Sequence, residues 1–523
     1  MRARAIMVLG TSSHVGKSLL TAALCRIFAD QGVSVAPFKS QNMSLNSSAT
    51  MEGLEIGRAQ ALQAEAARVT ASVHMNPILL KPAGNRTSQV VVRGRIWGRL
   101  SASDYHQRRV EELFPLVRES YEILAAKHEV IILEGAGSPA EINLKQHDIV
   151  NMRMAEVADA VCILVGDIDR GGVFASLLGT VQLLDETEQT RIQGFLINKF
   201  RGDVELLDPG IRMMEDRLQK PCLGVVPYIP HLALEEEDSI GLADITGETE
   251  PWLPEDARGR PLRIGVVALP SVSNFTDFDA MRNEPSVSLR FCREPSQLAL
   301  ADLIILPGSK QTVEDLLWMR RQGIDSCVVA HADRGGLVVG ICGGMQMLGI
   351  TIVDSLAMEH GDQADGLGLL PFTTRMNPDK VTRLITGRLS SSLLFGCPVP
   401  AMDIDGYEIH IGETIYADGA QSFSILNGHE PDGCISPDTR IFGTYLHGIF
   451  DDDTFRHTVL AAARSFHQLA PANNFESWKQ KREDSFNRLA DVVRESLDMQ
   501  RIFDWIGISY KSQGQIAPME QVR

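Results

Sequence analysis

Short apolar runs alternate with longer stretches of helical periodicity along most of the chain. Apolar runs of about four to eight residues are typical of buried parallel strands. Five such runs occur in the first half, at residues 5–9, 34–38, 130–133, 161–165 and 194–197. Three more follow in the second half, at residues 263–269, 302–306 and 336–339. The alternation predicts an α/β fold for both halves, each built on a largely parallel sheet.

A polar segment rich in proline and acidic residues separates the two halves. We therefore predict a first domain at 1–235, a linker at 236–261, a second domain at 262–510 and a polar tail at 511–523. A chain of 523 residues is too long for one hydrophobic core, which agrees with two domains. Near the end, apolar residues recur at helical spacing, and we interpret them as core packing rather than as a partner surface: Phe486, Leu489, Ala490, Val493 and Leu497.

The composition narrows the class of protein. The formal net charge of -17 argues against a nucleic-acid or anionic-membrane partner, because either needs a basic surface. The eight cysteines contain no CxxC pair, so neither a disulfide framework nor a zinc site is expected. The first apolar run is too short for a signal peptide, and no uncharged stretch is long enough to span a bilayer. We expect a cytoplasmic enzyme.

The first candidate site is a glycine loop between the first predicted strand and a helix. It reads Gly10-Thr-Ser-Ser-His-Val-Gly16-Lys17-Ser18. Backbone N–H groups of such a loop, and of the helix that follows it, point at the phosphates of a nucleotide. Lys17 adds a positive charge, and the Ser18 hydroxyl is suited to Mg²⁺. We predict that Gly10, Gly16, Lys17 and Ser18 bind ATP.

Two further strands end in acidic residues at the carboxyl edge of the predicted first sheet. Glu134 follows the run at 130–133, and Asp167 follows the run at 161–165. Ligands of open α/β sheets bind at this edge, and carboxylate oxygens are ligands that Mg²⁺ prefers. We predict that Ser18, Glu134 and Asp167 coordinate Mg²⁺, directly or through water. The alternative for either carboxylate is a structural cap of a loop or helix.

The second candidate site has a cysteine at the apex of a strand, a tight glycine turn and a helix start. The residues are Gly340-Ile-Cys342-Gly343-Gly344, the pattern of a nucleophile elbow. The helix dipole favours the thiolate, and small glycines leave room for backbone N–H groups to approach an oxyanion. We predict Cys342 as the nucleophile and Gly343 as one oxyanion donor. Gly308, in a glycine turn after the run at 302–306, is predicted to be the second donor.

A cysteine nucleophile of this kind needs a base. His447 follows a strand-like run and is the best candidate, because such a pair meets only in the fold. Glu408 is a candidate to lie nearby and orient His447, although an ordinary strand carboxylate is an equal alternative.

Both sites resemble known families. The glycine loop has five residues between Gly10 and Gly16, one more than the usual four, and so resembles the dethiobiotin synthetase group of P-loop enzymes. That resemblance implies that Asn198 reads the adenine edge, with a turn-forming asparagine as the alternative. The elbow and histidine resemble the class I glutamine amidotransferase domain, whose cysteine forms a thioester with glutamine and releases ammonia. That class usually has a glutamate two residues after the histidine, where this chain has Ile449.

A phosphate-activating domain and an ammonia-releasing domain in one chain imply a single reaction scheme. A carboxylate and ATP give an acyl phosphate, and ammonia converts it to an amide. Nothing in the spacing or composition identifies the carboxylate.

Longer strings resemble the cobyric acid synthase family over nearly the whole chain, namely residues 37–44, 134–143, 166–172, 198–203 and 274–277. This resemblance implies stepwise amidation of the b, d, e and g carboxylates of adenosylcobyrinic acid a,c-diamide with ATP and L-glutamine. It implies Mg²⁺ with ATP and no tightly bound organic cofactor.

The same resemblance bears on the substrate site. Lys39, Gln41 and Asn42 would face substrate or nucleotide, unless they form only a polar, well-capped loop. Lys81 and Arg86 are further candidate contacts for an anionic corrinoid.

Two other interpretations differ in substrate or class. Cobyrinic acid a,c-diamide synthase performs the same chemistry on other carboxylates of the ring, and the strings 41–44 and 274–277 favour cobyric acid synthase over it. A P-loop switch ATPase would carry an additional lysine early in the glycine loop, where this chain has Ser12. An intact elbow cysteine would also be unexplained in such a switch.

Overall fold

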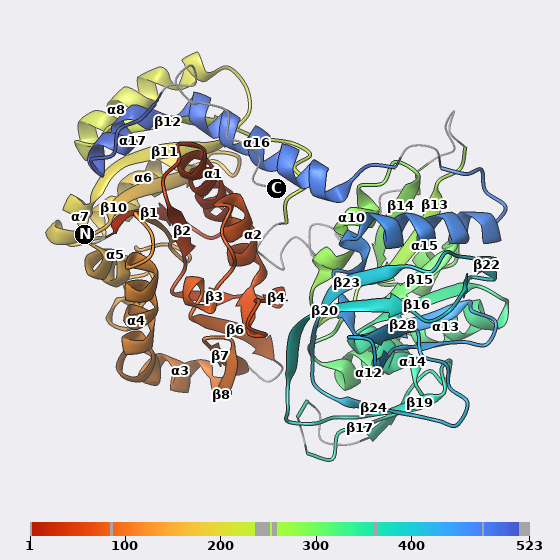
Figure 1. The fold of residues 1–523 in the computed structure, drawn as a ribbon. Helices are drawn as coiled ribbons and strands as arrows, with labels where there is room; N and C mark the ends of the chain where they lie inside the picture. The colour runs from red at the N-terminus through yellow and green to blue at the C-terminus, as the bar shows by residue number, and fades with distance from the viewer. Residues whose placement is uncertain are drawn as a thin grey trace.

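The computed structural model describes residues 3–83, 87–235, 252–253, 259–356, 358–359, 363–472 and 475–511. These residues form two α/β domains that lie side by side (Figure 1). Most of the predicted linker at 236–261, and all but the first residue of the predicted tail at 511–523, lie outside the described residues. Within these ranges, no helix combines the length and the apolar character needed to cross a membrane.

The first domain is built on a parallel sheet of six strands. In spatial order these are β12 (Cys222–Pro227), β11 (Ile192–Phe200), β10 (Val161–Asp167), β1 (Arg4–Gly10), β9 (Val130–Glu134) and β2 (Val35–Phe38). Ile6 of β1 lies opposite Val161 of β10 and Ile132 of β9, so β1 is central. The five apolar runs predicted here are confirmed as strands, and β12 is additional.

Helices cover both faces of this sheet because its strands are apolar on both sides. Met7 and Leu9 of β1 enter a core shared with α4 (Phe114–Ala125), α5 (Met152–Ala158), α6 (Val173–Gln182) and α8 (Asp208–Leu218). Ile6 and Val8 enter the opposite core, with α1 (Lys17–Asp30). Strands buried on both faces read as continuous apolar runs, which is why the sequence predicts them well.

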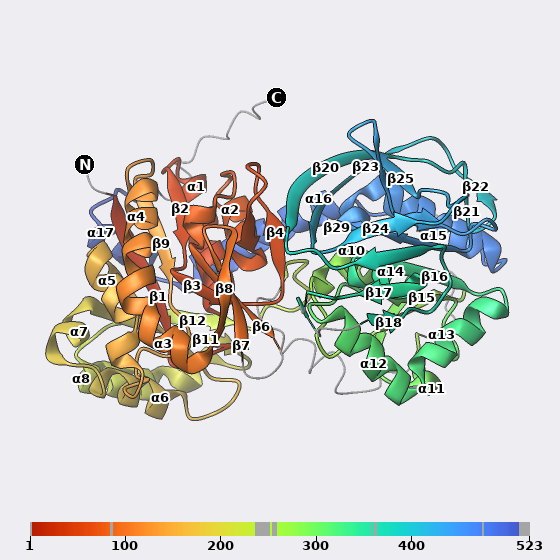
Figure 2. The same cartoon turned by 90° about the horizontal axis from the view of Figure 1, so that it is seen from below.

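A smaller part of the first domain faces the second domain (Figure 2). Its sheet contains β3 (Gln41–Met43), β6 (Ile78–Ala83), β7 (Thr87–Val92) and β8 (Arg95–Ser101). A separate hairpin, β4 (Ser47–Ala49) and β5 (Glu55–Gly57), leads into α2 (Arg58–Ala66). The short helix α3 (Ala102–Arg108) follows β8, and α7 (Glu186–Arg191) precedes β11.

The second domain has its own six-stranded sheet. Its spatial order is β14 (Val287–Cys292), β13 (Leu262–Val267), β15 (Leu303–Leu306), β16 (Leu337–Ile341), β28 (Ile441–Thr444) and β27 (Cys434–Ile435). All neighbours are parallel except β27 with β28. The three runs predicted here are confirmed as strands. The core of this domain joins α12 (Thr312–Gln322), α13 (Ile324–Asp333), α14 (Gly343–Leu348) and α15 (Asp453–Phe466).

Smaller, mostly antiparallel sheets complete the second domain. One sheet runs β26 (Glu430–Asp432), β25 (Ser424–Leu426), β20 (Val381–Leu389), β23 (Asp403–His410) and β29 (Leu446–His447). The other runs β18 (Gln363–Asp365), β17 (Thr351–Val353), β19 (Phe372–Arg375) and β24 (Glu413–Tyr416). A final pair consists of β21 (Leu393–Leu394) and β22 (Cys397–Pro398).

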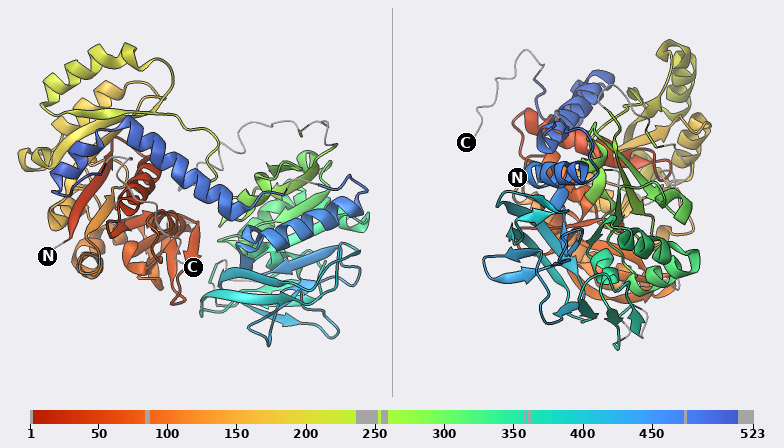
Figure 3. Two further views of the ribbon diagram at one scale, coloured as in Figure 1. Left: turned by 45° about the horizontal axis from the view of Figure 1, so that its top comes forward. Right: turned by 90° about the vertical axis from the view of Figure 1, so that its right-hand side faces the viewer.

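The end of the chain returns to the first domain, which corrects the predicted boundary at 510. Helix α16 (Trp478–Ser496) runs from the second domain to the first, and α17 (Met499–Trp505) packs there (Figure 3). Phe486, Leu489, Ala490 and Val493 are buried in the core formed by α1 and one face of the first sheet. The prediction of core packing is confirmed, but the core is that of the other domain. Periodicity shows that a helix has an apolar face, not which surface covers it.

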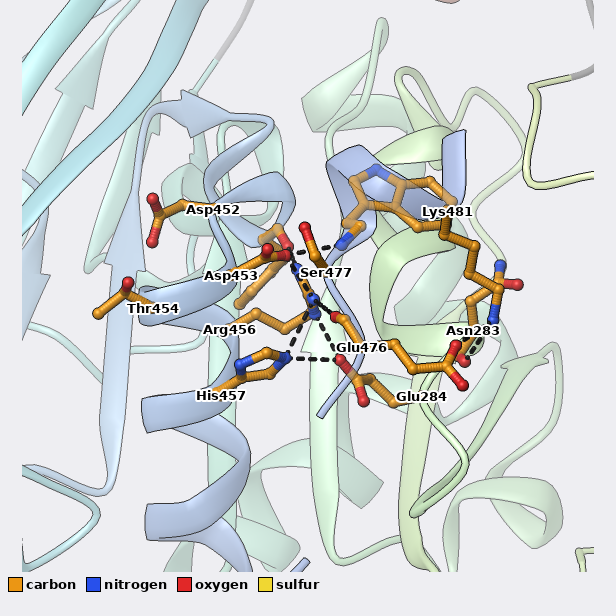
Figure 4. A network of polar contacts seen from close by, with 12 residues as sticks. Asn283, Glu284, Asp452, Asp453, Thr454, Arg456, His457, Glu476, Ser477 and Lys481 are labelled. Carbon is orange, nitrogen blue, oxygen red and sulfur yellow. Dashed lines mark hydrogen bonds and ion pairs between the residues drawn. The ribbon is translucent and has the colours of Figure 1, made fainter. Parts of the chain in front are cut away.

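The start of α16 is held in the second domain by a polar network (Figure 4). Arg456 of α15 is buried and donates to Glu284 at 2.8 Å and to the Glu476 carbonyl at 2.9 Å. Asp453 accepts from Arg456 and from the Trp478 N–H, both at 2.8 Å. Helix α16 is thus anchored in one domain and packed in the other.

Candidate active sites

The glycine loop joins β1 to α1 as predicted. Gly10 ends the strand, and Gly16 has a φ of 94°, a left-handed conformation that glycine adopts without strain. A Cβ atom at Gly10 would lie 2.9 Å from the Lys17 Nζ, so a side chain there would collide with the lysine. Lys17 Nζ donates to the carbonyls of Ser12, at 2.9 Å, and Gly137, at 3.2 Å. The loop therefore wraps around an ammonium group, as in a phosphate-binding loop.

Glu134 is the centre of a buried polar cluster beside this loop. Its two carboxylate oxygens accept from Ser18 Oγ at 2.8 Å, Lys39 Nζ at 2.9 Å and Gln63 Nε2 at 2.6 Å. The structure thus brings together Ser18 and Glu134, which were both predicted as Mg²⁺ ligands. Mg²⁺ binds hydroxyl and carboxylate oxygens, and phosphates and water usually complete its coordination shell. Gln63, on α2, was not predicted, because a glutamine within a helix carries no motif.

Asp167 and Asn198 lie on adjacent strands at the same edge of the sheet. Asp167 pairs with Lys199 Nζ at 3.1 Å and accepts the Asp169 N–H at 2.8 Å. Asn198 Nδ2 donates to the Val15 carbonyl of the glycine loop at 2.8 Å. The Asn198 side chain thus holds the loop in place, and its adenine contact stays a prediction.

The candidate substrate residues follow β2. Lys39 is buried against Glu134, Gln41 accepts the Tyr105 hydroxyl at 2.6 Å, and Asn42 Nδ2 donates to Gln60 at 3.1 Å. The geometry places Lys39 nearest the nucleotide cluster.

Two further basic residues were suggested as corrinoid contacts. Lys81 is buried and pairs with Glu55 at 2.7 Å, and its contact with the substrate stays a prediction. Burial requires a partner for an ammonium group, and Glu55 supplies it. Arg86 lies outside the described residues.

Cys342 sits at a strained turn between β16 and α14. Its φ of 50° and ψ of -109° are rare for a residue with a side chain, as expected of a nucleophile elbow. Gly344 must lack a side chain, since a Cβ there would lie 2.0 Å from the Leu306 carbonyl oxygen. The Cys342 thiol points at the Ile409 carbonyl, with 3.7 Å between Sγ and O.

His447 is positioned by Asp277. Its Nδ1 atom lies 2.7 Å from Asp277 Oδ2, and the Gly448 N–H donates to Asp277 Oδ1 at 3.0 Å. Burial alone would lower the pKa of His447, but the Asp277 carboxylate and the Cys342 thiolate raise it to about 10. The imidazolium is thus the favoured form beside the cysteine. The arrangement of Cys342, His447 and Asp277 fits the roles of nucleophile, base and orienting acid, and these roles stay predictions.

Glu408 does not orient His447, contrary to the expectation that it lies nearby for that purpose. Its carboxylate binds Arg383 and lies 3.5 Å from His410 Nε2. Successive side chains of β23 point to opposite faces of the sheet. Tyr407 points toward His447, with 5.5 Å between the ring centroids, so the neighbouring Glu408 points away from it. Asp277 was missed because it is far from His447 in sequence. In the sequence, residues 274–277 indicate only a family resemblance and no contact with His447.

The two predicted oxyanion residues lie next to the catalytic pair. A Cβ at Gly308 would lie 3.1 Å from His447 Cε1, and one at Gly343 would lie 2.8 Å from the Ser309 N. The Gly343 N–H is in the first turn of α14, where backbone donors have no partner within the helix. The loop after β15 and the start of α14 therefore converge where the prediction put the oxyanion. Their function as donors stays a prediction.

Comparisons with known proteins agree with this arrangement. Residues 6–240 match the model of the CobQ/CobB/MinD/ParA nucleotide binding domain, and residues 263–455 match that of the CobB/CobQ-like glutamine amidotransferase domain. A cobyric acid synthase of Syntrophobacter fumaroxidans is 47% identical over 97% of this chain and 99% of its own. That of Caldanaerobacter subterraneus is 44% identical over 95% and 97%, and that of Moorella thermoacetica 45% over 97% and 98%.

The predicted fold class is therefore confirmed, with a P-loop nucleotide-binding domain followed by a glutamine amidotransferase domain. Identity at this level over nearly the full length also makes the chain a glutamine-dependent, amide-forming ligase. The chain belongs to the cobyric acid synthase family.

Proposed function

We propose that this enzyme amidates the b, d, e and g carboxylates of adenosylcobyrinic acid a,c-diamide, with ammonia from L-glutamine and activation by ATP. The observation that carries the proposal is the pairing of two centres in one chain. The Cys342–His447–Asp277 arrangement suits ammonia release, and the Ser18–Glu134 cluster beside the glycine loop suits phosphate activation. The relatives named cobyric acid synthase supply the substrate class.

In the glutaminase centre, Asp277 holds Nδ1 of His447 and leaves Nε2 for the thiol. The Cys342 thiolate attacks the amide carbon of glutamine, and the N–H groups of Gly308 and Gly343 stabilise the oxyanion. The His447 imidazolium gives its proton to the departing ammonia. Water, deprotonated by His447, then hydrolyses the thioester to glutamate.

In the synthetase centre, an oxygen of the corrinoid carboxylate attacks the γ-phosphate of ATP and displaces ADP. Ammonia attacks the resulting acyl phosphate, and phosphate leaves to give the amide. Lys17 and the loop N–H groups hold the phosphates as negative charge moves. Mg²⁺, when bound with ATP, would neutralise phosphate charge, and the oxygen atoms of Ser18, Glu134 and Asp167 are suited to hold it.

The segment that contains Lys39, Gln41 and Asn42 is proposed to face the corrinoid or the nucleotide. Lys39 is the strongest of the three, because its ammonium group already contacts Glu134 at 2.9 Å. An ammonium group at this place would pair with the carboxylate being activated or with the γ-phosphate.

Mass spectrometry of the diamide incubated with enzyme, Mg-ATP and glutamine tests this function. Four successive conversions of acid to amide are expected, all lost when ATP or glutamine is omitted. Amidation only at a and c of cobyrinic acid, with no reaction of the diamide, would point to cobyrinic acid a,c-diamide synthase instead. Glutamine hydrolysis without any mass change would require a different carboxylate substrate.

A further inference from the structure

Strand β4 belongs to the first domain but lies beside β20 and β23 of the second (Figure 2). The Ser47 N–H donates to Asn274 Oδ1 at 2.9 Å, and both residues are buried. Two residues later, Ala49 packs with Tyr407 and Ile409 of β23. One short strand therefore contacts the second domain at two separate points.

Each contact leads directly to the catalytic pair. Asn274 precedes the single turn that presents Asp277, and the Asp277 N–H donates to the Asn274 carbonyl at 3.0 Å. Asp277 in turn holds His447. On the other side, the Tyr407 ring stacks on the His447 ring, and the Ile409 carbonyl oxygen lies 3.7 Å from Cys342 Sγ. His447 thus lies between two groups of residues that both rest on β4.

The same strand is tied to the synthetase site. Ser47 Oγ donates to Glu55 at 2.8 Å and accepts from Lys81 at 2.9 Å, within a buried ionic cluster. The segment that precedes β4 begins with Lys39, whose ammonium contacts Glu134 beside the glycine loop. A shift of this segment on substrate binding would therefore be passed to β4, because buried ion pairs and packed strands do not deform independently.

We propose that Asn274 is a positioning residue that couples occupancy of the synthetase site to the orientation of His447. Glutamine is then hydrolysed fastest when the corrinoid and ATP are bound, and less ammonia is lost. This inference rests on the proposed function, since it names a regulation of the same two sites.

The test uses purified full-length enzyme and the variant Asn274→Gly. Asn274 has a φ of 52°, which glycine adopts readily, so this change removes the bond to Ser47 without straining the turn. Asn274→Asp keeps an acceptor oxygen for Ser47. Asn283→Gly is the control, because the Asn283 side-chain amide donates to the Asp279 carbonyl of its own segment, at 2.9 Å. Ala49→Gly weakens the second contact from the opposite domain.

The readout is the factor by which the diamide and Mg-ATP raise kcat for glutamine hydrolysis. This factor should fall about 5- to 100-fold in Asn274→Gly and in Ala49→Gly, the usual size of a coupling between sites. Synthesis from ammonia should match wild type in both. Asn274→Asp and Asn283→Gly should keep the stimulation.

Three results would overturn the coupling through Asn274: no stimulation in the wild type, wild-type stimulation in Asn274→Gly, or an equal loss of ammonia-dependent synthesis in that variant. These results leave the proposed function intact as long as the wild type forms amides. A wild type that forms no amide from glutamine or ammonia would instead contradict the proposed function.

Discussion

At the scale of single residues, the glutaminase centre depends on groups held in unfavourable states. Cys342 occupies a backbone conformation that few residues with side chains adopt. His447 and Asp277 are almost fully buried, and each compensates the charge of the other. The surrounding packing must maintain both the strain and the burial. Chemistry at this centre should therefore respond sharply to changes of one atom or one charge.

Cys342→Ala should abolish synthesis from glutamine and leave synthesis from free ammonia, because formation of the acyl phosphate needs no thiolate. Amide formation is measured with each nitrogen donor in turn. Cys327→Ala, which removes a half-buried free thiol elsewhere in the domain, should keep both activities. An equal loss of amide formation with both nitrogen donors would contradict the assignment of glutamine hydrolysis to the second domain and of carboxylate activation to the first.

Lys17→Ala should abolish synthesis with either nitrogen donor, because phosphate activation precedes both routes. The Lys17 ammonium contacts the Ser12 carbonyl of the glycine loop at 2.9 Å, so its charge lies where the loop would hold the phosphates. The same amide assay checks this, with melting temperature as a control for folding. If Lys17→Ala still forms amides from ammonia, the glycine loop is not needed for activation of the carboxylate.

Asp277→Asn should lower kcat for glutamine hydrolysis by up to about 10⁴-fold, the size seen when the orienting aspartate of a triad becomes neutral. It should also change the pH dependence of stability. In the wild type, the raised pKa of His447 stabilises the fold fully below about pH 6.5, and this stability is lost as the pH rises to about 10.

Thermal denaturation from pH 6 to pH 10 measures that second effect. The difference in melting temperature between wild type and Asp277→Asn should be largest near pH 6 and should close toward pH 10. A constant difference over this range would mean that His447 does not carry the extra proton in the folded protein.

At the scale of elements, the last two helices connect the domains. Helix α16 begins in the polar network of the second domain and ends in the core of the first. Arg26 of α1 makes paired hydrogen bonds to Glu483 of α16, at 2.7 and 2.9 Å. Arg482 binds Glu235, which also holds Arg58 of α2. Helix α16 therefore stabilises the synthetase domain, although it follows the glutaminase domain in the chain.

Phe503→Ala should destabilise the first domain by about 3–5 kcal/mol, the usual cost of truncating a buried phenylalanine. Phe503 is fully buried on α17, and its ring stacks on Phe28 of α1 at 4.2 Å. Denaturant unfolding measures the loss. Phe475→Ala, at a site 43% exposed, is the matched control and should change stability little. If the free energy of unfolding of Phe503→Ala equals that of the wild type, α17 contributes no packing energy to the first domain.

At the scale of the whole molecule, buried charge joins the two domains. Glu55 of the first domain pairs with Lys81 of the same domain and with Lys380 of the second. Burial alone would raise the pKa of Glu55, but Lys380 and Lys81 hold it well below its usual range. A buried carboxylate between two ammonium groups fixes the domains in one relation, because separating them would leave charges without partners.

Glu55→Gln should destabilise the protein by about 3–5 kcal/mol, because buried Lys81 and half-buried Lys380 lose their counter-charge. The depressed pKa means that this stabilisation is present above the unfolded value of about 4.5 and is lost as the pH falls below it. Melting temperature at pH 7 and at decreasing pH checks both statements. Glu52→Gln, at an exposed site three residues earlier, should behave as wild type throughout.

The sequence by itself determined the local features of this protein. Strands buried on both faces, the glycine loop and the cysteine elbow all depend on residues close together in the chain, so their patterns are visible in it. His447 was found because a cysteine in an elbow needs a base. Tertiary structure alone decided which carboxylate meets that histidine, since Asp277 and Glu408 both carry a carboxylate and only packing distinguishes them. It also decided which core covers α16 and where β4 contacts the second domain, because burial depends on the surfaces available in space rather than on order along the chain.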